Sequence, residues 1–208
     1  EHGASLLDTA WMAYPGHGSD QARIMVNDRF AYVLALDADG DDQGTQAQHM
    51  EVLLRWTQMA LAEHSLRTDA LKPDGTAYHH QMHYGNAYSV HLLRYAAPMA
   101  YVLRGSPYAL PAASVQSLGK GLWVMQLYAA DFSCPRAIGG RILEVVDILK
   151  DFWETFILLG ALAADYPGLA QYDPAGVAVR LARLRGSLRG NDPEPMRLYA
   201  RLQAAATP

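Results

Sequence analysis

The chain has 208 residues and a formal net charge of -4, with 50% hydrophobic and 18% charged residues. This apolar content is enough for a folded core, which excludes a disordered chain and predicts a single domain over residues 1–208. The net negative charge excludes the broad basic field that attracts nucleic acid. An anionic polymer therefore has to be held by a few well-placed cations.

The cysteine count and the hydropathy limit the class further. The single cysteine, Cys134, excludes an intrachain disulfide and a paired-cysteine zinc site. The most apolar long stretch, residues 142–164, is interrupted by charged side chains such as Glu144 and Asp147. We therefore expect a buried helix there and no membrane span. The chain starts at Glu1 without a signal-peptide pattern, which decides nothing about its compartment.

Helical spacing of apolar residues predicts the first elements of the chain. One helix is expected over residues 5–14, where a Pro-Gly pair ends it, and a second over residues 20–36. A third is expected from Thr45, because Thr45 and Gln48 have the spacing of a capping box. The residues expected on its apolar face are Val52, Leu53, Trp56, Met59 and Ala60.

Two loops separate the helices that follow. Residues 65–87 show no hydrophobic period and are interpreted as a long irregular loop. A structureless loop of that length is uncommon unless it is functional. Helices are expected over residues 89–103 and 111–127, and a second loop with proline and glycine over residues 129–140.

The remainder of the chain again indicates helices. The buried helix over residues 142–164 follows the second loop, and Asp173-Pro174 and Asp192-Pro193 each place a capping side chain before a proline at the first helical position. No segment has the two-residue period of a strand. The expected fold class is therefore all-α, built from antiparallel helix pairs. Core packing, more than stacking on sugar rings, is expected of the four tryptophans. They are Trp11, Trp56, Trp123 and Trp153.

The first loop concentrates the side chains that carry proton chemistry, with three histidines and three tyrosines between Tyr78 and Tyr88. A zinc site through His79, His80 and His83 is one alternative. The spacing is not that of the helical His-Glu-x-x-His motif and no carboxylate ligand is evident, so we expect no metal and no cofactor. Ordinary loop side chains bonded to backbone or water are a second alternative, favoured for any single histidine, whereas the cluster favours a site.

The order of these residues resembles the catalytic loop of the hyaluronate and chondroitin lyase family. The resemblance is carried by Asp74-Gly-Thr-Ala-Tyr-His-His80 and by Tyr84-Gly-Asn-Ala-Tyr88, and it looks closest to the broad-specificity chondroitin ABC lyases. It extends over roughly residues 27–163. Three further segments also fit the family pattern, namely residues 41–43, 101–108 and Gly140-Arg141.

The resemblance implies a set of site residues. The catalytic residues would be His80, Tyr88 and Arg141, although counting back from Tyr88 with the hyaluronate-lyase spacing selects His79 in place of His80. The residues expected to bind substrate are His79, His83, Tyr84, Asn86 and Arg136.

The resemblance also implies the reaction. Family members cleave the 1,4 bond on the non-reducing side of a uronic acid by β-elimination, so one group must take the C5 proton and another must stabilise the carboxylate as charge builds on it. Arg141 supplies a forked positive charge. Tyr88 acts as base and then returns a proton to the leaving oxygen, which requires nearby cations to lower its pKa. This hypothesis requires the two loops to meet.

The fold implied by the resemblance is part of an α/α toroid, an incomplete α/α barrel without the family's C-terminal β-sandwich domains. The expected partner is an acidic polysaccharide, with no nucleic acid and no membrane, and the expected location is secreted or periplasmic. We expect weak or no activity unless another chain or domain completes the cleft. Two alternatives stay open: an alginate or heparin-type lyase on the same scaffold, and a non-catalytic carbohydrate-binding helical domain.

Overall fold

The computed structural model of the protein is built mainly from helices, which confirms the all-α class. It describes residues 26–36, 43–65, 70–79, 81–85, 91–129, 133–138, 152–172, 176–177 and 193–206. The helices are α3 (Asn27–Ala35), α4 (Gln43–Leu61), α5 (His91–Leu103), α6 (Ala112–Tyr128), α7 (Trp153–Leu162) and α9 (Pro193–Ala206). Two 3-10 segments accompany them, η3 (Arg136–Ile138) and η5 (Pro167–Tyr172).

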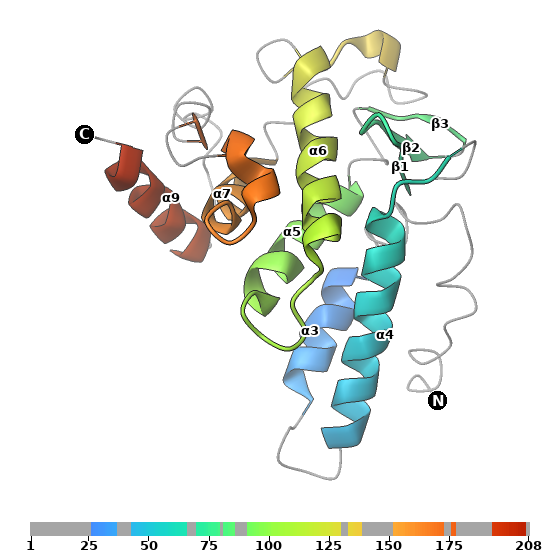
Figure 1. Ribbon diagram of the computed structural model, residues 1–208, viewed down its shortest axis with the longest axis vertical. Coiled ribbons are helices and arrows are strands. Elements are labelled where there is room, and N and C mark those ends of the chain that lie inside the picture. Colours follow the sequence, from blue (N-terminus) through green and yellow to red (C-terminus); the bar gives the residue numbers. More distant parts are fainter. Residues whose placement is uncertain are drawn as a thin grey trace.

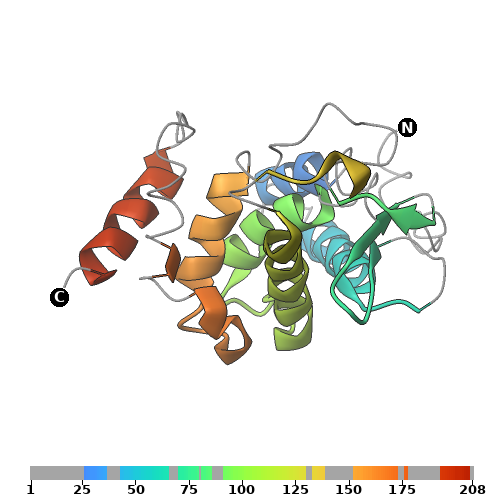
Figure 2. The ribbon, with the colours of Figure 1, turned by 90° about the horizontal axis from the view of Figure 1, so that it is seen from above.

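The helices lie in a row rather than around a single axis in the described part of the chain. Figure 1 shows α3 and α4, and then α5 and α6, as antiparallel neighbours. Figure 2 shows the order from α9 at one side, through α7, α5 and α6, to a small sheet at the other. The expected antiparallel pairs are therefore present, and the toroid stays a prediction.

Helix α5 forms the centre of the core. Its residues Leu92, Leu93, Ala97, Met99 and Ala100 are at most 1% exposed, because α6 and α7 pack on different sides of it. A helix that is apolar on most of its surface is typical of such a buried position. Each fully buried leucine contributes roughly 1.5–3 kcal/mol to folding. Helix α5 thus fixes the position of α6, from which the functional residues below are placed.

The sequence predicted α5 and α6 well and the first helices less well. The expected cap at Thr45 is wrong, because α4 begins at Gln43 and Thr45 lies inside it. The amide of Gln46 instead joins α4 to α3 by donating to the carbonyl oxygens of Val33 and Leu36, at 2.9 and 3.0 Å. Met59, expected on the apolar face, is 43% exposed, since at 100° per residue it points away from the buried stripe.

The first loop contains strands that the sequence did not predict. They form a three-stranded antiparallel sheet in the order β1-β2-β3, with β1 at Ala70–Leu71, β2 at Ala77–His79 and β3 at Met82–His83 (Figure 1). Leu71 pairs with Ala77, and Tyr78 pairs with His83. The interpretation of residues 65–87 as irregular was wrong here, because strands of two or three residues are too short to show an alternating pattern.

The turn between β1 and β2 is held by a side chain. The Asp74 carboxylate accepts hydrogen bonds from the Thr76 backbone N–H at 2.9 Å and from the Thr76 hydroxyl at 2.6 Å. Gly75 has a φ of +83°, which glycine adopts without strain. The Asp-Gly-Thr run is therefore an Asx-type turn that orients the hairpin.

The later elements partly overlap their predictions. Helix α7 occupies the end of the predicted helix 142–164, and Pro193 is the first residue of α9, as the Asp192-Pro193 pair predicted. The predicted helix at residues 5–14 and the start at Asp173-Pro174 lie outside the described residues. Among the helices of the described ranges, none has both the length and the apolar character needed to cross a bilayer.

Candidate active site

The two loops singled out by the sequence meet at the C-terminal end of α6. The backbone N–H of Gly85, just after β3, donates to the carbonyl oxygen of Ile138 in η3 at 3.1 Å. The buried thiol of Cys134 lies 3.9 Å from the carbonyl oxygen of Gly85, within reach of a weak hydrogen bond. Segments more than 45 residues apart are thereby joined through both polar groups of one glycine. We call this contact of Gly85 with Cys134 and Ile138 the loop junction.

Tyr128, the last residue of α6, packs against the junction at His83 and Gly85. Its hydroxyl lies 3.2 Å from Nε2 of His83, and the two rings meet edge to face with centroids 5.3 Å apart. A β-carbon at Gly85 would lie 2.9 Å from the Tyr128 hydroxyl and 3.1 Å from the His83 ring. Glycine at position 85 is therefore what allows the phenol, the imidazole and the backbone to approach so closely.

The electrostatics make this pair neutral. Burial lowers the pKa of His83 below its ordinary value, and the Asp74 charge only partly opposes this effect. Burial, and secondarily the nearby Cys134, raises the pKa of Tyr128 well above its ordinary value. At pH 7 the phenol therefore keeps its proton and shares a hydrogen bond with Nε2 of a neutral imidazole. Such a tyrosine positions its neighbours and is a poor base.

A buried cation lies beside the sheet. Lys72 is 6% exposed, and its Nζ lies 4.8 Å from the centroid of the Tyr78 ring. The Tyr78 and His83 rings are in turn 6.1 Å apart. An ammonium over an aromatic face is stabilised by the ring quadrupole, and it brings positive potential to the hairpin. The sequence did not predict this contact, because Lys72 lies within the predicted loop and belongs to no recognisable motif.

His79 and Tyr84, both expected to bind substrate, are 1% and 3% exposed. Their rings meet edge to face at 6.0 Å, on the covered side of the hairpin. In this structure they form the packed support of β2, and their contact with substrate stays a prediction. Arg136, by contrast, is exposed at the first position of η3.

The other expected site residues are not placed by the structure. His80, Asn86, Tyr88 and Arg141 lie outside the described residues, so their roles stay predictions. The same holds for the zinc alternative, which includes His80. Within the described ranges, no group of three or more His, Cys, Asp or Glu side chains is arranged to hold a metal ion.

Sequence reasoning missed the residues that join the loops. Tyr128 fell between the predicted helix 111–127 and the predicted loop 129–140, and Cys134 was considered only for a disulfide or a paired-cysteine zinc site. A signal for Tyr128 does exist, since a polar aromatic residue at a helix end often has a partner for its hydroxyl. Its partner, His83, is 45 residues away and becomes visible only in the fold.

Comparison with known proteins places the chain in a family. None of the curated proteins matches it. The family model described as "Lyase, catalytic" matches residues 18–185, a range that includes the hairpin, the loop junction and the expected catalytic positions. The match extends over most of the 208 residues. The chain therefore belongs to this lyase catalytic-domain family, whose members are enzymes that act on polysaccharides.

Proposed function

We propose that this polysaccharide lyase cleaves uronate-containing glycosaminoglycans, namely chondroitin or dermatan sulfate and hyaluronan, by β-elimination. Tyr88, His80 and Arg141 are the proposed catalytic residues. The observation that carries the proposal is the loop junction, in which Gly85 N–H donates to the carbonyl oxygen of Ile138. The reaction needs a base and a cation from two distant loops on one sugar ring, and the junction joins those loops.

Covalent geometry extends the argument from the junction to the reactive side chains. Tyr88 follows Gly85 by three residues, and Arg141 follows Ile138 by three. Three residues span at most roughly 11 Å of extended chain. The segments that carry the phenol and the guanidinium therefore leave from one place, which supports their action on the same uronate.

The proposed step begins at C5 of the uronate. Arg141 holds the carboxylate with its forked guanidinium, and the His80 imidazole donates a hydrogen bond to it as negative charge builds there. The Tyr88 phenolate takes the C5 proton, the C4–C5 double bond forms and the C4–O4 bond breaks. The same proton then passes from Tyr88 to the departing O4, so no water enters the products.

The base requires an environment different from that of Tyr128. Tyrosine titrates near ~10, and a shift of two or three units corresponds to about 3–4 kcal/mol of preferential stabilisation of the phenolate. A cation such as Arg141 provides this, whereas burial beside a neutral histidine has the reverse effect, as Tyr128 shows. We therefore assign the base to Tyr88 and a positioning role to Tyr128.

Exposed Arg136 is the proposed contact for a sulfate or a neighbouring carboxylate. It lies in η3, two residues before Ile138. His79, His83, Tyr84 and Asn86 remain proposed binding residues. We further propose that the enzyme meets its acidic polymer outside the cytoplasm, and that another chain or domain completes the cleft.

The test is the ultraviolet absorbance of the unsaturated uronate product. The protein is incubated separately with chondroitin, hyaluronan, alginate and heparin. The proposal expects a rise with chondroitin or hyaluronan that is lost in Tyr88→Phe and kept in Tyr128→Phe, the matched removal of another phenol. A rise in absorbance with alginate or heparin alone would show that the substrate class is a different one. Binding of polymer with no rise on any of them would point to a non-catalytic carbohydrate-binding domain.

A further inference from the structure

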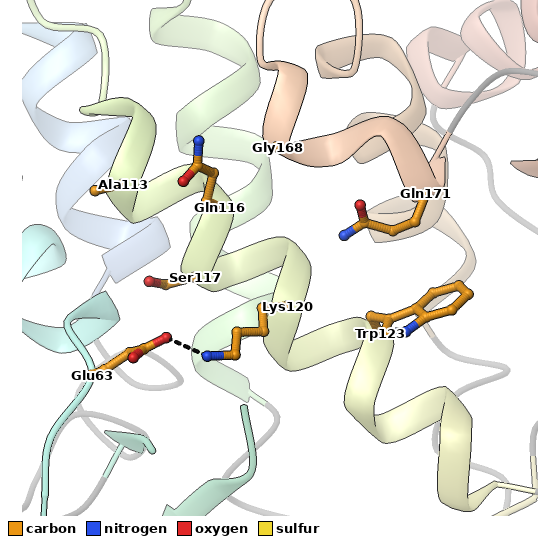
Figure 3. Close-up of a pocket in the computed structure, with 8 residues that line it drawn as sticks. All are labelled: Glu63, Ala113, Gln116, Ser117, Lys120, Trp123, Gly168 and Gln171. Atoms are coloured by element: carbon orange, nitrogen blue, oxygen red, sulfur yellow. Dashed lines mark hydrogen bonds and ion pairs between the residues drawn. The ribbon is translucent and has the colours of Figure 1, made fainter. Parts of the chain in front are cut away.

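A groove runs along α6 on the N-terminal side of Tyr128, with lining residues from Ala113 to Trp123 on this helix. Its volume is about 810 Å³, within the range of roughly 300–1,000 Å³ typical of small-ligand sites. Helix α6 provides one wall, η5 the facing wall, and Glu63, two residues beyond the end of α4, closes one side (Figure 3). The lining residues that carry the argument are Glu63, Gln116, Lys120, Trp123, Gly168 and Gln171.

The walls of this groove are fixed by buried contacts. The hydroxyl of Tyr172, a fully buried residue, donates to the carbonyl oxygen of Gly119 at 2.9 Å and anchors η5 to α6. Leu169 lies so close to Gly119 that a β-carbon there would be 2.3 Å from its Cδ2. The groove is therefore formed before any ligand arrives, which lowers the entropic cost of binding.

The charged groups of the groove neutralise each other. The Lys120 ammonium lies 2.7 Å from Oε1 of Glu63 and also bonds to the carbonyl oxygen of Pro73. Among the eight lining residues, all of them described, Lys120 is the cation and Glu63 the anion. A uronate or a sulfate would thus meet a cation that is already paired, so the groove selects against anionic groups.

The remaining groups suit an uncharged sugar. Trp123, expected in the core, is half-buried and lines the groove, with Gln171 on the facing segment (Figure 3). An aromatic face carries partial negative charge and attracts the slightly positive C–H face of a pyranose. Gln116 makes no hydrogen bond within the described residues, so its amide can both donate to and accept from a ligand.

We propose that the groove between α6 and η5 is a second carbohydrate subsite that binds an uncharged pyranose, such as an N-acetylhexosamine unit of the polymer, against Trp123. This inference rests on the proposed function, because it assigns the unsulfated hexosamines of hyaluronan or chondroitin to the groove and the uronates to the loop junction. Trp123 precedes Tyr128 by five residues, about 7–8 Å along the helix axis. One chain of sugars can therefore run from one region to the other.

The experiment measures binding of two probes by calorimetry, the neutral trimer of N-acetylglucosamine and the anionic trimer of galacturonate. The neutral trimer is expected to bind, with an affinity that added sodium chloride leaves unchanged. Trp123→Ala is expected to weaken it about tenfold or more, and Trp123→Phe, which keeps an aromatic face, less. Gln116→Leu is a surface change that tests the amide without disturbing the core.

The matched control is Leu127→Ala, which removes an exposed apolar side chain from the same helix outside the groove and is expected to change nothing. Failure of the wild-type protein to bind the neutral trimer would overturn the subsite, and so would binding by Trp123→Ala and Gln116→Leu that is as tight as that of the wild-type protein. Tighter, salt-sensitive binding of the galacturonate trimer would show that the subsite does not prefer an uncharged sugar. Tyr88→Phe is expected to lose elimination and keep trimer binding, so failures of the two proposals are distinguishable.

Discussion

The loop junction and the groove lie on one helix, α6, yet they are built in opposite ways. At the junction, the polar groups are hydrogen-bonded to one another, since the backbone of Gly85 bonds to Ile138 and the Tyr128 phenol bonds to His83. In the groove, the amide of Gln116 and the ring of Trp123 line an open surface. The junction therefore positions backbone segments for chemistry, whereas the groove offers a finished surface for binding.

The two regions also differ in how their ionisable groups avoid a net charge. Burial keeps His83 and Tyr128 neutral, so the junction gains order without free charge. In the groove, Lys120 and Glu63 are both partly exposed and cancel by pairing. A surface pair of this kind contributes only about 0–1 kcal/mol to stability, so its main effect is on which ligands are admitted.

The largest expected effect separates chemistry from positioning. Tyr88→Phe is expected to lower kcat for elimination by about 10²–10⁴-fold, because the base and the proton donor to O4 are both lost. Steady-state kinetics on hyaluronan and chondroitin measure it. Tyr128→Phe is the control, expected to reduce the rate by less than about tenfold. Equal losses of kcat in the two variants would mean that Tyr88 is not the base.

Gly85→Ala is the next largest change and acts on the junction. The new methyl group would lie 2.9 Å from the Tyr128 hydroxyl, so the two loops have to separate. We expect a loss of about 1–3 kcal/mol in the free energy of unfolding, together with a fall in elimination rate. Urea unfolding and the absorbance assay measure the two effects.

Gly44→Ala provides the matched glycine control for this experiment. Gly44 lies in α4, and a β-carbon there would meet nothing within 4 Å. The change is expected to stabilise the protein by about 0.5–1 kcal/mol through helix propensity and to leave elimination unchanged. A Gly85→Ala variant as active as Gly44→Ala would remove the junction from the mechanism.

Gly119→Ala sharpens the comparison from the groove. Its methyl group would collide with Leu169 and push η5 away, which opens the groove. We expect a destabilisation of about 1–3 kcal/mol and weaker binding of the neutral trimer, with elimination of a short uronate substrate less affected. The reverse pattern, with intact trimer binding and lost elimination, would contradict the division of roles between the two regions.

The smallest effect is a pH dependence of stability at the junction. The folded-state pKa of His83 is lowered from its ordinary value of 6.5, so the unfolded chain binds the proton more readily. The stabilisation of the folded state by neutral His83 is therefore present above about pH 6.5, and it is lost as the pH falls from there through the folded-state pKa. His83→Gln is expected to lose less unfolding free energy than the wild-type protein between pH 7.5 and 5.5. An identical acid slope would mean that His83 titrates freely.

The sequence predicted α5 and α6, and it singled out the Asp74-Gly-Thr run, because both signals are local. The apolar runs of α5 and α6 exceed three turns, and the Asp74-Gly-Thr motif is contiguous. It did not predict β1 to β3, whose pairing depends on tertiary contacts rather than on an alternating pattern. The Gln46 bonds to α3 and the Tyr128–His83 contact also depend on residues at least ten positions away.

The tryptophans illustrate the same limit. Core packing was expected of them, and Trp56 and Trp153 are 5% and 6% exposed, which confirms it for both. Trp123 has the same kind of helical setting and packs against the core, but it is only half-buried and also lines the groove, so the expectation is confirmed only in part there. Trp11 lies outside the described residues. Helical spacing identifies a face, and only the packing of η5 decides whether that face becomes core or groove.

The most direct test of the account is a crystal structure of the Tyr88→Phe variant with a bound uronate tetrasaccharide. We expect the aromatic ring at position 88 and the Arg141 guanidinium to flank the same uronate, with the guanidinium on its carboxylate and the ring edge toward C5. A structure that places Arg141 on another face of the protein, or turns the ring at position 88 into the core, would contradict it.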